Sequence, residues 1–570
     1  MEQGQSLSEK KWFQKNETGK IEWCVFCFYV IAMVFIACFH EPWYDEAEAW
    51  QMARGASFSD LFFYIPHYEG HPALWYLLLA IPAKLGVPYE LGLKSIACGV
   101  AFVYGWLLLF LSPFPRVLRL LLPFHYFFFF QYGIVSRPYG ISVLCFLLMA
   151  MAFKTRKEKP VKFVIPMAFL CATSGYGIIL AGGICIAWVL EICMEKNWKI
   201  FSADFWKDKR ILSLAVLLLI AVLIILEIMP REDTYAVSQA GSNSLLTRLL
   251  YTFFVMLPDS TVLTVLEGAA FLNRAMIAFP VMLIGIILGV LLLCLLISAA
   301  SRKTLPYFII PYVLFALFSA FVYFCAHHMG MMLAFTIFWL WITLEDPDKY
   351  SVGRAIWGKV KIAESDKKSL QKLGIFGLAI LVIIPLYWSV TASVLDVLRP
   401  YYYGRDMAEF LKQTGLYKAK VMASYDIYKP FDEDEEVDVY SIVNTQIVAR
   451  PVAVLPYFEH NFCLNLNMGK DSGGYALHRL ASPKENEEVM NKWQEMGLPE
   501  VVIGPMNLEF VFGEEAKTAS YVPVYEYPPY VDIWKAFTSR YNITTKQYVY
   551  VRLELLEQYG LKQIMQSDFK

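Results

Sequence analysis

The segment 41–50 carries the residues of this chain best suited to chemistry. It holds four carboxylates within eight residues, among them the adjacent pair Asp45 and Glu46, and it directly follows an apolar run. Carboxylates this close to lipid are costly unless water, a cation or a substrate meets their charge. Such a group can act as a general base or hold a divalent cation. The alternative is that these acids only begin a surface helix, because acids favour the first turn.

A second group of candidate residues is the run Glu69-Gly70-His71-Pro72, in which glycine and proline predict a loop just before an apolar run. At the membrane rim, His71 could bind a phosphate when protonated or a metal when neutral. Asp45, Glu46 and His71 could together hold a divalent metal, although no certain cofactor is predicted. The alternative is an interfacial histidine within an aromatic belt.

Arg137, in the run Ser136-Arg137-Pro138-Tyr139, is the only Lys, Arg, Asp or Glu between Leu120 and Phe153. An arginine in such a setting needs an anionic partner, and a lipid phosphate or pyrophosphate suits its fork of donors. The alternatives are that Arg137 snorkels to the headgroups or pairs with a buried carboxylate.

His327 and His328 precede Met329-Gly330 at the end of a later apolar run. Adjacent residues of a helix point about 100° apart. We therefore expect at most one of these imidazoles to face a site, and the two make a poor metal pair. The alternative is a pair of histidines with no role beyond the membrane interface.

The composition predicts what must position these residues. The 570 residues are 57% hydrophobic and only 18% charged, whereas soluble domains are nearer a quarter charged. We predict a mainly α, polytopic transmembrane bundle in a cell membrane. The net charge of −1 argues against a nucleic-acid partner, which requires a basic face.

Apolar runs mark about 11–13 membrane spans, with boundaries good to a few residues. The runs lie at 22–39, 71–86, 91–112, 118–133, 136–153, 163–177, 178–195, 211–229, 276–300, 305–325, 329–344 and 373–397. Lysine-rich segments orient them by the positive-inside rule. The N-terminal tail 1–21 is then cytoplasmic, and the loop 40–70 and the region after 397 are extracytoplasmic.

One conflict arises between the span count and the charge rule. Four runs separate the outer loop from the basic cluster that begins at Lys154, and an even number of crossings would return the chain to the outer side. One run must therefore fail to cross. The candidates are 71–86 and 118–133, which are short and interrupted by Pro82 and Pro123.

The region 398–570 changes character, because its apolar runs are too short to span a bilayer. Helical spacing occurs at 404–414 and 485–496, and strand patterns occur at 421–424, 501–504 and 548–552. At about 170 residues, it is large enough for its own core. We predict three parts: the tail 1–21, a transmembrane domain 22–397 that includes the outer loop 40–70, and an extracytoplasmic α/β domain 398–570.

The order of these motifs resembles the bacterial protein O-mannosyltransferase-like glycosyltransferases, also described as dolichyl-phosphate-mannose-protein mannosyltransferase-like, of the glycosyltransferase C fold. The resemblance rests on Asp45-Glu46 after the first span, Gly70-His71-Pro72 at the second, and Arg137-Pro138-Tyr139 further on. It covers roughly residues 40–150. Where many relatives have an Arg-His pair late in the chain, this chain has Ala326-His327-His328.

The resemblance implies an enzyme that moves a sugar from a polyprenyl-phosphate donor, held beside membrane lipid, to a glycan, lipid or protein acceptor. It makes Asp45 the catalytic base and Glu46 its companion. It assigns substrate contacts to Glu69, His71, Arg137, Tyr139, His327 and His328. We expect single displacement with inversion at the sugar carbon, because one base and no enzyme nucleophile suffice. The alternatives are a transporter or flippase of a lipid-linked sugar, a glycan polymerase or ligase, and a non-catalytic scaffold.

Overall fold

The computed structural model describes residues 19–234, 244–262, 279–324, 326–358, 364–398, 402–423, 453–466, 475, 477, 482–504, 508–527 and 547–564. Most of the predicted tail 1–21 lies outside these residues. Seven apolar stretches within them have the length and composition to cross a membrane, and five shorter apolar helices accompany them. The coarse prediction of a multi-pass helical membrane protein is therefore confirmed. The total of 11–13 crossings stays a prediction.

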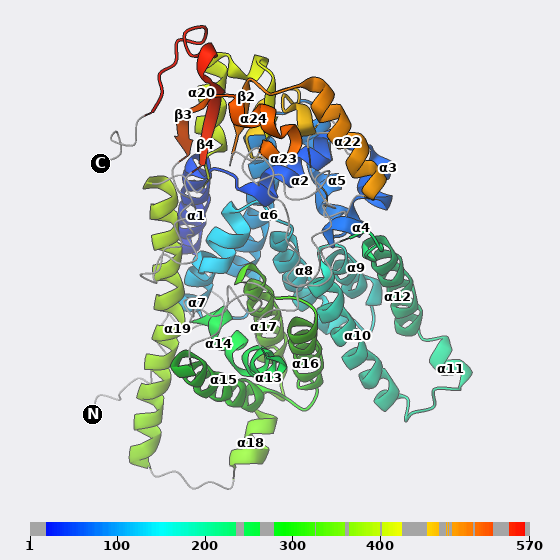
Figure 1. Ribbon diagram of the computed structural model, residues 1–570. Coiled ribbons are helices and arrows are strands. Elements are labelled where there is room, and N and C mark those ends of the chain that lie inside the picture. Colours follow the sequence, from blue (N-terminus) through cyan, green and yellow to red (C-terminus); the bar gives the residue numbers. More distant parts are fainter. Residues whose placement is uncertain are drawn as a thin grey trace.

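Each predicted apolar run coincides with a helical segment of the structure (Figure 1). The long segments are α1 (Lys20–Phe39), α6 (Tyr89–Trp106) with η3 (Leu107–Leu111), α7 (Arg116–Leu121) with η4 (Leu122–Phe124) and η5 (Phe127–Ile134), α10 (Gly175–Glu195), α12 (Lys209–Ile228), α15 (Phe279–Ala299) and α19 (Glu364–Leu398). The shorter ones are α5 (Leu74–Lys84), α8 (Tyr139–Ala152) with η6 (Phe153–Thr155), α9 (Pro160–Cys171), α16 (Pro306–Phe321) and α17 (Met329–Leu344).

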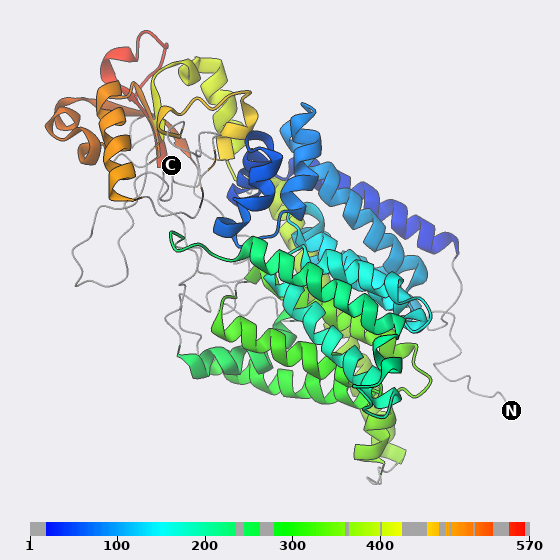
Figure 2. The same ribbon diagram turned by 90° about the vertical axis from the view of Figure 1, so that its right-hand side faces the viewer.

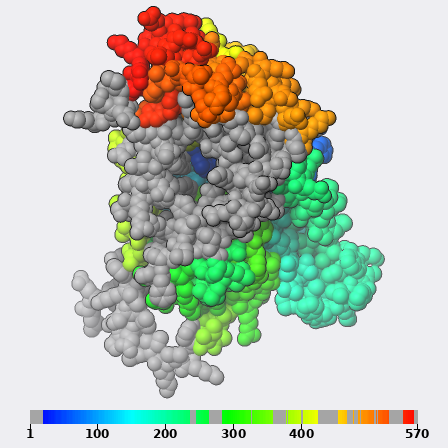
Figure 3. All heavy atoms as spheres, viewed as in Figure 1, coloured from blue at the N-terminus to red at the C-terminus, as the bar shows by residue number. Residues whose placement is uncertain are grey.

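A small sheet and its helices stand at one end of this bundle, here called the sheet end (Figure 2). In the space-filling view the C-terminal residues, orange to red, form the top of the molecule (Figure 3). At the other end, basic residues from several loops meet acidic partners. The Lys154 Nζ lies 3.2 Å from the Glu345 Oε1, and the Arg210 Nη1 lies 2.6 Å from the Glu195 Oε2. Each pair joins two segments that are separate in the sequence. The structure thus gathers basic loops at one end, as the charge rule requires, while sidedness itself stays a prediction.

The structure shows which of the two suspected apolar runs has both its ends at the same end of the bundle. At its start, α5 follows the loop of His71 at the sheet end, and at its end the Lys84 Nζ donates to the carbonyl of Ala56, 2.6 Å away, just after α2 (Tyr44–Gly55). Both ends of α5 are therefore on one side. With 11 residues it is also too short to span, at 1.5 Å per residue.

The other suspect, 118–133, does run from one end of the bundle to the other. Arg116 at its start binds Glu22 of α1 at 2.7 Å, whereas the Ser136 N–H just beyond it donates to Glu46 of α2 at 2.6 Å. Three helical segments then lead from the outer loop to the Lys154 cluster. They are α6–η3, α7–η5 and α8–η6. An odd number removes the conflict with the charge rule.

The C-terminal region contains a four-stranded sheet in the order β1-β2-β4-β3. The strands are β1 (Val421–Ala423), β2 (Val501–Ile503), β3 (Tyr521–Tyr527) and β4 (Gln547–Arg552), and the helices include α20 (Gly404–Thr414), α22 (Pro483–Met496), α23 (Glu509–Phe512) and α24 (Glu514–Thr518). β1 and β2 are parallel, and the other pairs are antiparallel. Both predicted helices and the three predicted strands coincide with α20, α22, β1, β2 and β4, while β3 was not predicted.

Charged contacts fasten this region to the bundle. Arg405 of α20 donates to both carboxylate oxygens of Glu90 on α6, at 2.9 and 2.6 Å, and the Tyr457 hydroxyl also donates to Glu90 at 2.7 Å. Arg54 of α2 donates to the carbonyl of Phe458 at 2.7 Å. Charge-assisted bonds of this kind contribute about 1.5–3 kcal/mol each, so the sheet region and α2 are positioned as one unit.

Glu41 makes this junction sensitive to pH. Its side chain is buried at 2% exposure and accepts a hydrogen bond from the Arg405 N–H. Burial raises the pKa of Glu41 from 4.5 to about 8, although Arg405 opposes the shift. Between these values the folded protein binds more protons than the unfolded chain, so stability falls as the pH rises through this window and is level above it.

We predict that E41Q removes this pH dependence. Glutamine keeps an acceptor oxygen for Arg405 but carries no charge to desolvate, so the variant is expected to be more stable than the wild type at pH 9 by a few kcal/mol. Apparent Tm values in detergent at pH 5 and pH 9 measure the effect. The exposed Glu557, substituted as E557Q, is the control. Equal pH slopes in the wild type and E41Q would contradict the assignment.

Candidate functional site

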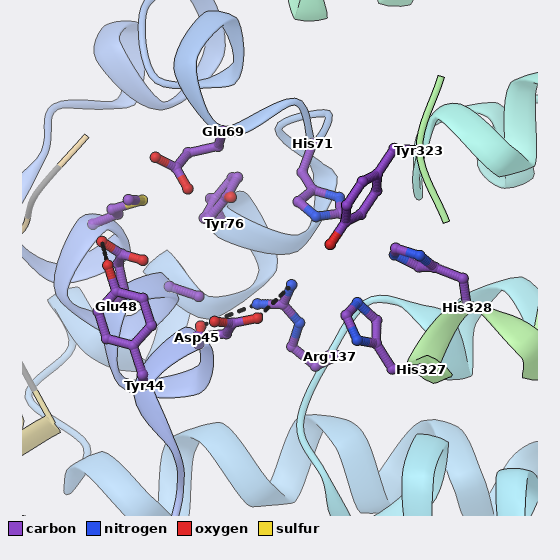
Figure 4. A pocket seen from close by; sticks show the side chains of 12 residues that line it. Tyr44, Asp45, Glu48, Glu69, His71, Tyr76, Arg137, Tyr323, His327 and His328 are labelled. Atoms are coloured by element: carbon purple, nitrogen blue, oxygen red, sulfur yellow. Dashed lines mark hydrogen bonds and ion pairs between the residues drawn. The ribbon is translucent and has the colours of Figure 1, made fainter. Parts of the chain in front are cut away.

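A cavity of about 220 Å³ lies at the sheet end of the bundle, and segments distant in the sequence supply its walls. It is here called the central cavity. Its lining consists of Tyr44, Asp45, Glu48, Ala49, Met52, Glu69, His71, Tyr76, Arg137, Tyr323, His327 and His328. Figure 4 shows three carboxylates toward one side, and Arg137 with three imidazoles toward the other. The fold thus brings together six of the eight residues that sequence analysis selected.

Helix α2 presents the acidic side. It begins after Trp43, and the Glu46 carboxylate accepts a hydrogen bond from the Trp43 N–H at 3.0 Å, which caps the first turn. Asp45 and Glu48 are three residues apart and therefore share one face of the helix, which faces the cavity. Tyr44 donates to Glu48 at 3.0 Å. A helix does begin at these acids, as the alternative of a surface helix proposed, but it is largely buried, and Asp45 and Glu48 line a cavity.

Asp45 and Arg137 form an ion pair across the cavity, marked in Figure 4. The Arg137 Nη2 lies 3.2 Å from the Asp45 Oδ2, and its Nη1 donates to the Asp45 carbonyl oxygen, also at 3.2 Å. The carboxylate is 25% exposed and the guanidinium 12%. Burial alone lowers the pKa of Arg137, but Asp45 raises it above the ordinary value. Arg137 is therefore charged, and both side chains are still partly exposed to a ligand.

A short helix and a glycine place His71. Helix α4 (Pro66–Glu69) ends at Gly70, whose φ of +64° is the left-handed conformation that glycine adopts without strain. The turn directs Glu69 and His71 into the cavity (Figure 4). The predicted loop at Gly70-His71-Pro72 is therefore present.

His327 and His328 both line the cavity, so the expectation that only one would face it is wrong. The two lie in a 3₁₀ turn, η9 (Ala326–His328), rather than in a regular helix, and their ring centroids are 4.1 Å apart. The Tyr132 hydroxyl donates to the His327 carbonyl at 2.6 Å and fills the space above Gly330, where a Cβ would lie only 2.4 Å from the Tyr132 ring. Burial lowers the pKa of both imidazoles well below the ordinary value, and Arg137 contributes to the shift. Both are neutral at pH 7.

Two predicted site residues lie beside the cavity rather than in its lining. Tyr139 is buried, and its hydroxyl is 2.9 Å from the His328 Nε2, so it supports that imidazole. Glu46 is fully buried and accepts hydrogen bonds from the backbone of Trp43 and Ser136. The predicted metal set of Asp45, Glu46 and His71 is not assembled, because Glu46 points away from the cavity. Among the residues described here, no group of three His, Cys, Asp or Glu side chains is arranged to hold a metal ion.

Sequence reasoning missed several lining residues. Glu48 could have been found, because it lies three residues after Asp45 on a segment that was expected to be helical. Tyr44, Tyr76 and Tyr323 carry no such signal, because aromatic residues are frequent throughout this chain. These three tyrosines can be recognised as lining residues only in the folded protein, where their separate segments surround the cavity.

The fold and the cavity define a multi-pass helical membrane protein with an ionised, partly open site at the sheet end. Comparisons with protein-family models, with curated proteins and with solved structures find no match to this chain.

Proposed function

We propose that the chain is an integral-membrane glycosyltransferase that moves a sugar from a polyprenyl-phosphate donor to an acceptor hydroxyl on the extracytoplasmic side. The observation that carries the proposal is the opposition of Asp45 to Arg137 and the imidazoles within one cavity. A carboxylate is suited to take a proton, and a guanidinium is suited to hold a phosphate. The motif resemblance in residues 40–150 supports the same reaction, and we extend it to the glycosyltransferase C fold.

Asp45 is assigned the role of general base. The acceptor oxygen attacks the anomeric carbon of the donor, the hydroxyl proton passes to the Asp45 carboxylate, and the bond between the anomeric carbon and the phosphate oxygen breaks. The electron pair of that bond leaves with the polyprenyl phosphate. Glu48 and Glu69 lie on the same side of the cavity and are placed to accept hydrogen bonds from sugar hydroxyls.

Arg137 is assigned to the leaving phosphate, whose negative charge grows in the transition state. A guanidinium has five N–H donors, so Arg137 can meet a phosphate oxygen while it still contacts Asp45. A neutral imidazole donates through one N–H. His327 and His328 can therefore add hydrogen bonds to the phosphate without a further cation, and His71 lines the same cavity.

The test is a transfer assay with the purified protein reconstituted in closed lipid vesicles. A panel of polyprenyl-phosphate hexoses and pentoses serves as donor, and membranes from the expressing cells serve as acceptor source. The expected result is consumption of one donor, release of polyprenyl phosphate, and a product with inverted anomeric configuration by NMR. Retention of configuration would exclude single displacement. Movement of the intact donor across the bilayer without cleavage would favour the transporter instead.

A further inference from the structure

His40 lies where four segments of the bundle meet. It ends α1, where its N–H donates to the Ile36 carbonyl at 2.8 Å, and it is fully buried. Its own carbonyl accepts a hydrogen bond from the Lys94 Nζ of α6 at 2.5 Å. Its ring faces Glu46 of α2 and Asp396 near the end of α19. A histidine at such a junction can transmit the position of one segment to another.

Both ring nitrogens of His40 face carboxylates. Its Nδ1 is 2.8 Å from the Asp396 Oδ2, and its Nε2 is 3.2 Å from the Glu46 Oε2. A neutral imidazole carries one N–H, so only the imidazolium donates to both partners. Burial alone lowers the pKa of His40, but Asp396 and Glu46 raise it to about 10. His40 is thus a buried cation shared by two acids.

Glu46 connects this cation to the central cavity. One of its oxygens accepts from the Ser136 N–H at 2.6 Å, and the other accepts from the Trp43 N–H at 3.0 Å. Glu46 is the neighbour of Asp45 in the chain, and Ser136 is the neighbour of Arg137. A single carboxylate therefore holds the backbone beside both members of the Asp45–Arg137 pair.

We propose that His40 is a positioning residue for the glycosyl transfer proposed above, on which this inference rests. As a cation shared by Glu46 and Asp396, it holds α2 and the Ser136 backbone at the spacing that keeps Asp45 opposite Arg137. It also ties that spacing to the end of α19. His40 is absent from the cavity lining and touches no reacting atom.

The charge of His40 is needed as well as its shape. The second oxygen of Asp396, Oδ1, is buried and has no hydrogen-bond partner among the described residues. Without the imidazolium, two buried carboxylates would face each other with no cation between them. A buried charge without its partner is strongly unfavourable, so α2 and α19 would separate or one acid would take up a proton.

The test compares H40Q, D396N and the double variant H40Q/D396N. For H40Q we expect kcat to fall on the order of 100-fold, the loss that a displacement of about 1 Å can cause, with the donor KM within about threefold of the wild type. D396N removes one acid, and its kcat is expected to be roughly tenfold below that of the wild type. The double variant removes the cation together with one acid and is expected to recover to roughly the level of D396N. A role in packing alone predicts no recovery.

The control is E22Q at the opposite end of the bundle, where the fully buried Glu22 binds Arg116 at 2.7 Å. It breaks a buried ion pair far from the cavity and should lower the apparent Tm while kcat stays within about threefold of the wild type. Equal kcat losses in E22Q and H40Q would show that the loss reflects stability, and would overturn the proposal.

A folded H40Q variant with wild-type kcat would also overturn it. If H40Q fails to fold, D396N decides alone: a wild-type kcat overturns the proposal, and a tenfold loss at unchanged KM supports it. The assay also separates this inference from the proposed function. A D45N variant that loses turnover beside an unaffected H40Q removes only the role of His40, whereas a wild-type protein that cleaves no donor of the panel removes the transferase itself.

Discussion

Replacing Asp45 with asparagine is expected to lower kcat by roughly 10²–10⁴-fold, the range that general base catalysis contributes. Asparagine has nearly the same shape and keeps an oxygen for the Arg137 Nη2, which lies 3.2 Å from the present carboxylate. Its amide cannot accept the proton of the acceptor hydroxyl. Donor KM should therefore change little while turnover collapses. Initial rates at varied donor concentration, with the donor that the panel identifies, measure both quantities.

The matched control for D45N is D60N. Asp60 lies nearby in the sequence, on α3 (Phe58–Phe63), where it is exposed and accepts a hydrogen bond from the Ser57 hydroxyl at 2.7 Å. It is not part of the cavity lining. D60N is expected to retain wild-type turnover. A D45N variant that folds and keeps more than a third of wild-type kcat would exclude Asp45 as the base.

Removing the guanidinium of Arg137 is expected to produce the second-largest loss. R137Q withdraws the charge that meets the leaving phosphate, and the loss of one such preorganised donor costs roughly 10²–10³-fold in kcat. R137K restores a positive charge but only as a point donor, without the planar fork. We expect it to recover part of the activity and to stay about tenfold below the wild type. The ordering wild type, R137K, R137Q is the diagnostic result.

The control for this series is R302Q at the opposite end of the bundle, where Arg302 is exposed. It is expected to match the wild type in kcat and in apparent Tm. R137Q must be compared with the wild type at equal folded fraction, because it also leaves Asp45 without its ion-pair partner. If R137Q loses stability but no turnover, Arg137 serves only the fold, as the alternative of a buried structural pair predicts.

The structure also supports part of that alternative. The sequence is equally consistent with three roles for Arg137. Its side chain could snorkel to the headgroups, pair with a carboxylate, or bind a phosphate. Arg137 does pair with a carboxylate, but that carboxylate is Asp45, the proposed base, and it lines an open cavity. The structural and the functional interpretations therefore describe the same contact, and only the kinetics of the variants separates them.

Much of the bundle could be predicted from sequence because a helix in lipid must satisfy its own backbone groups with apolar side chains outward. Every predicted apolar run is a helical segment in the structure. Length and composition could not show that α5 stays at the sheet end. That depends on Lys84 meeting Ala56, a contact between segments 28 residues apart.

Individual site residues could be predicted only where their chemistry was unusual for their surroundings. Asp45 and Arg137 stood out as charges beside or within apolar runs, and both lie in the cavity. Glu46 stood out for the same reason, yet it belongs to a buried network with His40 and Asp396, because its position at the helix start turns it away from the cavity. Neither His40 nor Asp396 could be selected as a site residue from sequence, because the two are in contact only in the folded protein. They lie 356 residues apart in the chain.

Local composition and the cost of charge near lipid are enough to predict a helical membrane protein, the positions of its apolar segments, and the charged residues that need a partner. Tertiary structure alone decided which partner each charge meets. Carboxylates three residues apart share a helix face by local geometry, but the approach of Arg137, His71, His327 and His328 to that face depends on how separate helices pack.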